Sequence, residues 1–243
     1  MSGFSVVSLN TQGCRNSFKR YFLLDSLKTK LNADIVFLQD IHTIPSEEDT
    51  WKLIWRGNIL FSHFSSNTAV IAICFSNKLD YQILEHKIIL PGRILHVTVC
   101  IQEQNYHLIN VYAPICPKEK VIFLRSLKHH LNDLESSTPI FLGGDFNCTI
   151  NPKLDRTGDN EPHPQTSAEF KHIVKRFNLI DTYRNIHLYQ QMYSWKRNDG
   201  IAARLDRIYI SKHYCQFVRY SEIKDCNFSD HDYIRLYLKE KKL

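Results

Sequence analysis

Four nearly uninterrupted apolar runs in this chain each end in polar residues, and this feature limits the possible folds most strongly. The runs and their polar ends are Val6–Leu9 with Asn10, Ile35–Leu38 with Gln39 and Asp40, Leu108–Val111 with Tyr112, and Ile140–Leu142 with Asp145 and Asn147. Short apolar runs of this kind predict strands that are covered on both faces. Polar side chains at the rims of strands are where a sheet usually carries its functional site. We therefore expect a site at these strand ends.

Helices and antiparallel strands account for the rest of the chain. Expected strands are Phe4–Leu9, Asp34–Leu38, Ile59–Phe61, Thr68–Phe75, Tyr81–Ile89, Ile94–Ile101, His107–Tyr112, Pro139–Leu142, Tyr189–Trp195, Leu205–Ile210, Gln216–Ile223 and Ile234–Leu238. Expected helices are Phe18–Leu31, a helix that begins near Ser46, one that carries Leu124, Leu127, Leu131 and Leu134, and Ala168–Phe177. The pair His129–His130 is expected to be solvated. Helices around successive strands with short links predict an α/β fold of two packed sheets with helices outside.

Composition excludes several classes of protein. The chain has 243 residues, 43% of them hydrophobic, and shows no linker, so we expect one folded domain over residues 1–243. Seven scattered cysteines without a C-x-x-C pair argue against a disulfide framework or a zinc site. The start lacks the pattern of a signal peptide, and no apolar run is long enough to span a membrane, so we expect an intracellular protein. The net charge of +6 is compatible with a polyanionic partner.

The polar residues at the strand ends are of types that suit phosphodiester hydrolysis. They comprise carboxylates, neutral amides and one histidine: Asp40, Asp145, Asp206, Asp230, Asn10, Asn147 and His231. Hard oxygen ligands suit Mg²⁺, and a carboxylate beside a histidine favours the imidazolium form. Hydrolysis of a phosphodiester needs activated water and stabilisation of charge on the phosphate oxygens. Metal, carboxylate base and cationic histidine together supply both.

Six short motifs that contain these residues occur in a fixed order. They are Ser8-Leu9-Asn10, Leu38-Gln39-Asp40, Asn110-Val111-Tyr112-Ala113-Pro114, Gly143-Gly144-Asp145-Phe146-Asn147, Arg204-Leu205-Asp206 and Ser229-Asp230-His231. In order and spacing they resemble the motif set of the exonuclease–endonuclease–phosphatase superfamily over nearly the whole chain. Each motif alone is weak, but six in order are highly specific.

Three further segments resemble the endonuclease domains of non-LTR (LINE-type) retrotransposons most closely. These are Leu154-Asp155-Arg156, Asn178-Leu179-Ile180-Asp181-Thr182-Tyr183-Arg184 and Tyr193-Ser194-Trp195. The resemblance implies a four-layer α/β sandwich, in which two mixed β-sheets pack together between helices. It also implies a Mg²⁺-dependent enzyme, with Mn²⁺ as a possible substitute, that nicks one strand of duplex DNA and so primes reverse transcription at the target.

The resemblance assigns metal binding to three residues. Asn10 and Asp40 would lie at the metal, with Asp40 as a direct ligand, and Asp230 would lie close to the metal or the phosphate. The superfamily normally has Glu at the position of Asp40. Because Asp is shorter by one methylene, its carboxylate falls about 1.5 Å short on a fixed backbone, whereas Mg²⁺ ligands lie near 2.0–2.1 Å. The sequence therefore predicts a weakened but functional site.

The resemblance assigns the chemistry to the remaining residues. Asp145 would orient or deprotonate the attacking water with Asn147 beside it. His231 would contact the scissile phosphate, held in orientation by Asp206, and Tyr112 would lie against the phosphate. Ser194 and Ser229 would be supporting hydrogen-bonding groups.

A basic hairpin is a candidate DNA contact. The turn Asn198-Asp199-Gly200 is a strong hairpin signal, and four basic residues flank it: Lys196, Arg197, Arg204 and Arg207. The plain interpretation is a solvated turn, and the alternative is a hairpin that lies in a DNA groove, where Lys196 and Arg197 bind the substrate. Arg156 is a further candidate contact.

Two other functions remain open from the sequence. One is an apurinic repair nuclease or a phosphatase of the same fold, because fold alone does not fix function. The other is a catalytically weakened relic that binds DNA without cutting it. The leading interpretation places the chain in a longer polyprotein that includes a reverse transcriptase, acting on double-stranded DNA in the nucleus, with no membrane partner.

Overall fold

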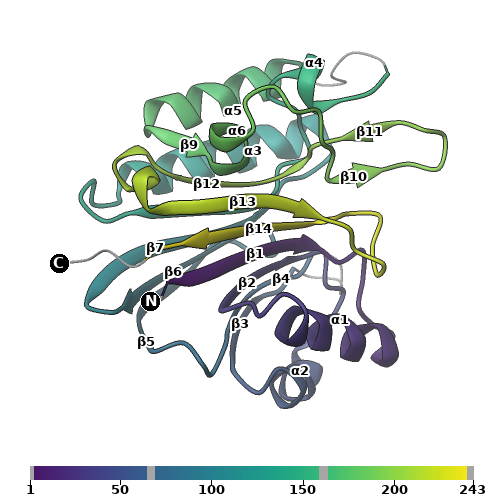
Figure 1. Cartoon of the computed structure of the whole chain (residues 1–243), viewed down its shortest axis with the longest axis vertical. Coiled ribbons are helices and arrows are strands. Elements are labelled where there is room, and N and C mark those ends of the chain that lie inside the picture. Colours follow the sequence, from purple (N-terminus) through teal and green to yellow (C-terminus); the bar gives the residue numbers. More distant parts are fainter. Residues whose placement is uncertain (1–2, 65–68, 159–163, 240–243) are drawn as a thin grey trace.

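Two six-stranded mixed sheets pack face to face, and helices cover the outer face of each (Figure 1). The structure is a computed structural model that describes residues 3–64, 69–158 and 164–239. The strand order is β13-β14-β1-β2-β4-β3 in one sheet and β5-β6-β7-β8-β12-β9 in the other. This arrangement confirms the predicted four-layer α/β sandwich.

The elements follow the predicted order along the chain. The strands of the first sheet are β1 (Phe4–Asn10), β2 (Ile35–Gln39), β3 (Asn58–Ser62), β4 (Ile71–Phe75), β13 (Val218–Lys224) and β14 (Tyr233–Leu238). Those of the second are β5 (Tyr81–Leu90), β6 (Ile94–Ile101), β7 (Gln104–Tyr112), β8 (Ile140–Asp145), β9 (Leu179–Asp181) and β12 (Asp206–Ser211). The helices are α1 (Ser17–Thr29), α2 (Glu48–Trp55), α3 (Pro117–Asn132), α4 (Pro152–Asp155), α5 (Pro164–Arg176) and α6 (Thr182–Ile186). A small hairpin of β10 (Trp195–Lys196) and β11 (Ala202–Ala203) projects from one end of the sandwich.

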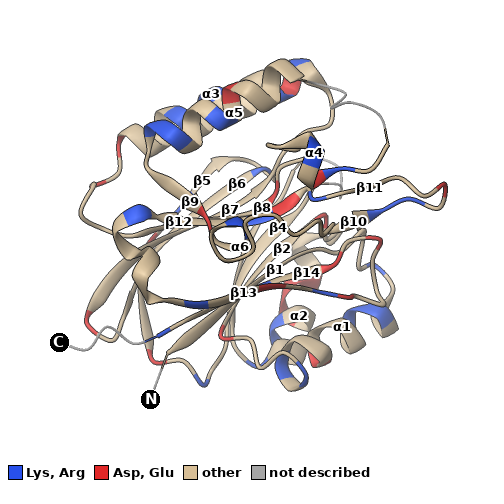
Figure 2. Ribbon diagram, turned by 45° about the horizontal axis from the view of Figure 1, so that its top comes forward, with Lys and Arg blue, Asp and Glu red and all other residues tan. Residues whose placement is uncertain are grey.

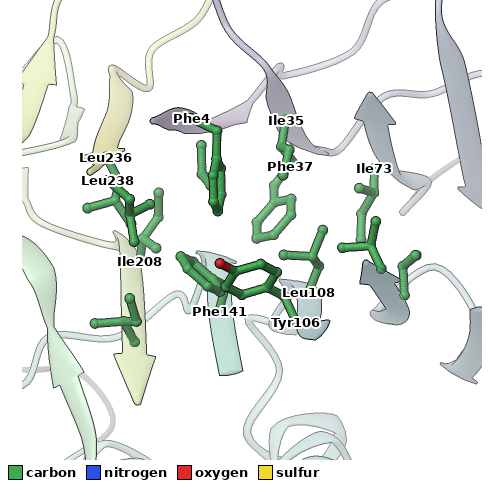
Figure 3. Packing of buried hydrophobic residues seen from close by; sticks show 14 of the residues in the cluster. Phe4, Ile35, Phe37, Ile73, Tyr106, Leu108, Phe141, Ile208, Leu236 and Leu238 are labelled. Carbon is green, nitrogen blue, oxygen red and sulfur yellow. The ribbon is translucent and has the colours of Figure 1, made fainter. Parts of the chain in front are cut away.

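Apolar side chains fill the space between each pair of layers. Between the sheets, Phe4 and Phe37 face Tyr106 and Phe141 (Figure 3), and Phe4, Phe37 and Phe141 are at most 4% exposed. A second cluster joins α1 and α2 to the first sheet, and a third joins α3 and α5 to the second sheet. The strands that carry the polar ends are therefore covered on both faces, as their apolar sequences predicted.

Strand pairing brings the polar strand ends together. The parallel partners β1 and β2 end at the paired residues Asn10 and Gln39, and the parallel partners β7 and β8 end at the pair Tyr112 and Asp145. The antiparallel strand β12 begins at Asp206, directly opposite Asp145. Since the carboxyl ends of parallel strands share one edge of a sheet, the predicted residues meet at one end of the sandwich.

The prediction of a strand over Tyr189–Trp195 is wrong except at Trp195, where β10 begins. Tyr189 is 83% exposed, so it has no core to pack against. The guanidinium of Arg184 donates to the carbonyls of His187, Leu188 and Gln190, and these side-chain bonds replace a strand ladder. Of the strand predicted over Thr68–Phe75, Thr68 lies outside the described residues and the observed strand begins at Ile71.

His130 is buried rather than solvated, in a cluster of three histidines that come from α3, β6 and β7. Its ring lies 4.7 Å from that of His96, whose Nε2 lies 3.0 Å from Nδ1 of His107. Burial lowers the pKa of all three, to about 3 for His96 and about 4 for His130. His96 and His130 are therefore neutral in the folded protein at mildly acidic pH.

We expect this cluster to make folding stability fall in mild acid. The unfolded chain binds protons at these histidines below about pH 6.5, while the folded protein does not, so stability decreases as pH falls from about 6.5 toward 4. The slope reaches up to about 1.4 kcal/mol per pH unit for each histidine that stays neutral. Urea unfolding at pH 6.5 and 5.0 measures it, and His96→Gln should flatten it. Equal slopes in the two proteins would rule out the cluster as the cause.

Candidate active site

A cavity of about 480 Å³ opens where the strand ends meet. Its walls comprise nine of the predicted site residues and four others: Asn10, Asp40, Tyr112, Asp145, Asn147, Arg156, Arg197, Asp230 and His231, with Gln12, Ile115, Trp195 and Leu205. Four predicted residues are absent from these walls: Asp206, Ser194, Ser229 and Lys196. Asp206, Ser194 and Ser229 form hydrogen bonds to wall residues.

Asp145 lies at the end of β8, and its side chain is fixed from two sides. Asn10 donates an amide hydrogen to Oδ2 over 3.0 Å, and the backbone N–H of Asn147 donates to Oδ1 over 2.8 Å. Burial and the negative charge of Asp206 raise the pKa of Asp145 to about 6, against the opposing charge of His231. A carboxylate with a raised pKa is a better proton acceptor near neutral pH than an ordinary aspartate.

Asn147 turns the chain away from β8 in a left-handed conformation, with φ of 47°. Its side-chain amide donates to the carbonyl of Ala113 over 2.8 Å. The ammonium group of Lys120, which is 1% exposed, donates to the Asn147 carbonyl over 2.6 Å. These bonds hold the loop that presents Asp145. The left-handed backbone explains why asparagine stands at this position, because asparagine tolerates that conformation better than most residues.

His231, Asp206 and Ser194 form a buried hydrogen-bonded chain. Nδ1 of His231 lies 2.7 Å from Oδ2 of Asp206, and the hydroxyl of Ser194 donates to the same oxygen over 2.7 Å. Burial lowers the pKa of His231, but the charge and hydrogen bond of Asp206, with the charge of Asp145, outweigh it and raise the pKa to about 9. His231 is therefore an imidazolium at neutral pH, and Nε2, its nitrogen not bonded to Asp206, is available toward the cavity that the residue lines.

Two serines fix the backbone around this chain. The hydroxyl of Ser194 accepts the N–H groups of Leu205 and Asp206, each over 3.0 Å. The hydroxyl of Ser229 donates to the Asn10 carbonyl over 2.8 Å and accepts the N–H of His231. Both serines thus form hydrogen bonds to the backbone of site residues, and their supporting role stays a prediction.

Asp230 and Asp40 lie on the cavity wall with partners that sequence reasoning missed. The indole N–H of Trp195 donates to Oδ2 of Asp230 over 3.0 Å. Nε2 of His42 lies 2.9 Å from Oδ1 of Asp40. Trp195 stands in the quoted segment Tyr193-Ser194-Trp195, but His42 has no sequence signal, because its contact with Asp40 depends on a local left-handed turn.

Tyr112 lies beside the acidic wall at the end of β7. Burial and the negative charges of Asp40 and Asp145 raise the pKa of Tyr112 far above its usual value, so its hydroxyl keeps its proton. The guanidinium of Arg93 lies 4.8 Å from the centre of the tyrosine ring and orients it. A neutral phenol here is a hydrogen-bond donor for an anionic ligand.

The basic residues around the hairpin divide into two groups. Lys196 and Arg197 have half-exposed side chains, paired with Asp232 and Asp199. Figure 2 shows basic residues on the β10 side of the projecting hairpin. Arg204, by contrast, is 2% exposed.

Arg204 and Arg207 belong to a buried ion-pair cluster and are not surface contacts. Nε of Arg204 lies 2.9 Å from Oδ1 of Asp155, and Nη1 of Arg204 lies 2.8 Å from Oδ2 of Asp181. Arg207 is 1% exposed and donates to the carbonyls of Cys148 and Arg204. The expectation that all four basic residues flank an exposed hairpin was therefore wrong for these two. The adjacent predicted contact, Arg156, lines the cavity.

The donor chemistry of the cavity fits a divalent cation. Carboxylates of Asp40, Asp145 and Asp230 and the amide of Asn10 offer the hard oxygen ligands that Mg²⁺ and Mn²⁺ prefer. Just behind the wall, Oδ1 of Asp206 is buried and has no hydrogen-bond partner within residues 3–64, 69–158 and 164–239. Ligand atoms of Asp145, Asp206 and His231 all lie within 4.8 Å of one another. Of these three, His231 is already engaged by Asp206, so the oxygen-rich wall around Asp40 is the better cation site.

Comparison with known proteins agrees with this architecture. Residues 7–231 match the endonuclease/exonuclease/phosphatase family. The chain is 33% identical over 237 residues to the uncharacterized 149 kDa protein of transposon TX1 from Xenopus laevis, a match that covers 96% of this chain and 18% of that protein.

Solved structures share the fold at lower identity. An AP endonuclease from Leishmania major matches with a TM-score of 0.82 and 16% identity, over 98% of this chain and 88% of that one. The endonuclease domain of TRAS1, a telomere-specific non-LTR retrotransposon, matches with a TM-score of 0.72 and 15% identity, over 98% of this chain and all of that one. The fold, the ordered site motifs and the match over residues 7–231 together lead to one conclusion. This chain belongs to the endonuclease/exonuclease/phosphatase family, and it is similar in sequence to a protein of transposon TX1.

Proposed function

We propose that this chain is a divalent-metal-dependent endonuclease that nicks one strand of duplex DNA. The observation that supports the proposal most strongly is that a proton acceptor and a cationic hydrogen-bond donor line the same cavity. Asp145 is a carboxylate with a raised pKa, held by Asn10 and Asn147, and His231 is a cation held by Asp206. A base and a cationic donor on one wall suit attack of water on a phosphodiester.

The residues of the chain divide the work of hydrolysis among them. Asp145 accepts a proton from the attacking water, while the amide of Asn10 keeps the carboxylate in place. His231 donates from Nε2 to an oxygen of the scissile phosphate, and Asp206 holds the ring by its other nitrogen. The protonated hydroxyl of Tyr112 donates to the phosphate as well. Each donor is positioned before the substrate binds, which lowers the cost of reorganisation in the transition state.

Asp40, Asn10 and Asp230 would hold the metal. When it is bound, the metal neutralises charge on the phosphate oxygens. Mg²⁺ is the proposed ion because oxygen ligands predominate on this wall, and Mn²⁺ would use the same ligands.

Duplex substrates with defined lesions test the nicking activity against its alternatives. Matched duplexes would be intact, would contain one abasic site, or would end in a 3′-phosphate. We expect cleavage of the intact duplex with Mg²⁺ and none with EDTA. Preference for the abasic duplex would instead support a repair nuclease, release of phosphate alone would support a phosphatase, and binding without cleavage would support a relic.

The proposed biological role is initiation of target-primed reverse transcription. The sequence similarity to a transposon protein supports this role. So does the length of the match, because this chain spans only 18% of that protein. The chain would then act within a longer polyprotein that also carries a reverse transcriptase, on chromosomal DNA in the nucleus. None of the helices in the described part of the chain is long and apolar enough to span a membrane.

We expect Lys196 and Arg197 to contact DNA from the hairpin. Their side chains are 55% and 53% exposed, and their acidic partners can be exchanged for phosphates. Replacing both by alanine should weaken DNA binding and reduce the slope of log K against log salt by about 1–2, because each phosphate contact contributes about 0.9. Fluorescence anisotropy across a salt series measures this.

Lys87 and Lys128 provide the matched control, because each pairs with a glutamate on another surface. Alanine at both removes the same charge from the chain but should leave the salt slope as in the parent protein. An equal change in slope for the two double variants would show that net charge, not the hairpin, determines binding.

A further inference from the structure

The contact between His42 and Asp40 lies at the point where this chain departs from its family. Asp40 stands where a glutamate is usual, and its shorter side chain has less freedom to reach into the cavity. Nε2 of His42 lies 2.9 Å from Oδ1 of Asp40. Since a carboxylate only accepts hydrogen bonds, the imidazole N–H is the donor. The contact is partly shielded, with Asp40 16% and His42 31% exposed at the side chain.

The backbone between the two residues is shaped for this contact. Asp40 and His42 both have left-handed backbone angles, with φ of 51° and 56°, on either side of Ile41, which is fully buried. Left-handed conformations are uncommon for residues other than glycine and cost free energy, so they persist only where surrounding contacts impose them.

Hydrogen bonds to the neighbouring loop impose these conformations. The carbonyl of Asp40 accepts the N–H of Gly13 over 2.7 Å and the hydroxyl of Thr11 over 3.0 Å, and the carbonyl of Ile41 accepts the N–H of Cys14 over 2.7 Å. The backbone under Asp40 is therefore fixed, and the direction of its side chain depends on its own contacts, with His42 at 2.9 Å and with the nearby hydroxyl of Tyr112.

Gly13 confines the imidazole ring on the side away from Asp40. A Cβ atom at this position would lie 3.0 Å from Nδ1 of His42, which is closer than an ordinary van der Waals contact. The glycine, with φ of 78°, lets the ring pack directly on the backbone. The ring thus has a backbone wall on one side and the Asp40 carboxylate on the other.

From these contacts we infer that His42 is a positioning residue for the metal ligand Asp40. It holds one carboxylate oxygen by a hydrogen bond and so orients the short side chain on the cavity wall. The inference rests on the proposed function, because it assumes that Asp40 binds a divalent cation. Hydrogen bonds to a ligating carboxylate are typically worth about 10–100-fold in metal affinity or activity. His42 would in this way offset part of the reach that Asp40 lacks.

Binding of Mn²⁺ to the DNA-free protein tests the inference without using activity. Calorimetric titration would compare the unmodified chain with His42→Ala and His42→Gln. We expect His42→Ala to weaken Mn²⁺ binding by about 10-fold or more. His42→Gln should recover most of it, because glutamine keeps an N–H donor that can reach the carboxylate.

His63 supplies the matched control. Its Nε2 lies 2.8 Å from Oε1 of Glu48, so His63→Ala removes a similar histidine–carboxylate contact outside the cavity. Mn²⁺ affinity and nicking should stay at the parental level in this variant. Thermal unfolding of all variants would establish that each one is folded, and His42→Gln carries the test if His42→Ala is not.

The outcomes separate the inference from the proposed function. If the parent binds Mn²⁺ and nicks DNA but His42→Ala binds Mn²⁺ as tightly, His42 has no positioning role and the function stands. Tighter binding by His42→Ala would mean that the histidine competes with the metal, which also overturns the inference. If the parent neither binds Mn²⁺ nor nicks DNA, the function and the inference fail together.

Discussion

Replacing Asp145 by alanine is expected to slow DNA nicking by about 10²–10⁴-fold, the usual contribution of a positioned general base. Asp145 is 1% exposed, and Asn10 and the Asn147 backbone fix its carboxylate, so alanine removes a proton acceptor whose geometry the protein sets. Initial rates on supercoiled plasmid measure the loss.

DNA affinity should not fall in this variant and should stay equal or rise slightly, because alanine removes a negative charge that repels phosphate. Anisotropy with an intact duplex would check this. Asp49→Ala is the control, since that carboxylate is almost fully exposed on α2. A rate for Asp145→Ala within a few-fold of the parental rate would remove Asp145 from the chemistry and would transfer the role of base to another residue.

Replacing Asp206 by alanine is expected to damage both catalysis and stability. His231 would lose the carboxylate that holds its ring and keeps it charged, and we expect nicking to fall by at least about 10²-fold. Removing one partner of a buried ion pair typically costs about 3–5 kcal/mol, so the free energy of unfolding should fall by a similar amount. Plasmid nicking and urea unfolding measure the two effects.

Ser194→Ala separates the two effects of Asp206. It removes the hydroxyl that donates to Asp206 and accepts the N–H groups of Leu205 and Asp206, but it leaves the carboxylate on His231. We therefore expect a stability loss of about 1–3 kcal/mol, below that of Asp206→Ala. Nicking should fall much less than in Asp206→Ala. If both variants lose activity equally, the position of the loop at Leu205 matters more than the charge on His231.

The sequence was enough to predict the layers of the fold. It was also enough to predict that the residues of the site motifs come together at one end of the sheets. Apolar strands that end in Asn10, Tyr112 and Asp145 have to be covered on both faces, and parallel pairing places their ends at one edge. The chemistry of the predicted residues is also consistent with the observed contacts, since His231 lies on Asp206 and Asn10 lies on Asp145. The roles assigned to them remain predictions.

The sequence could not predict contacts that depend on backbone turns or on burial. His42 reaches Asp40 because two residues adopt left-handed backbone angles, and no spacing rule anticipates that. The sequence placed Arg204 beside an exposed hairpin. In the structure it is buried and forms ion pairs with Asp155 and Asp181, which come from segments distant in the sequence. The segment at Tyr189 has the composition of a strand, but it is exposed and pairs with no strand in the part of the chain that the structure describes.

Incubation of the purified protein with supercoiled plasmid is the most direct test of the central claim that this cavity nicks DNA with a divalent metal. Parallel reactions would contain Mg²⁺, or Mg²⁺ with excess EDTA. The account predicts open-circular plasmid with Mg²⁺ and none with EDTA. Plasmid that stays supercoiled with Mg²⁺ and with Mn²⁺, in the presence of folded protein, would contradict it.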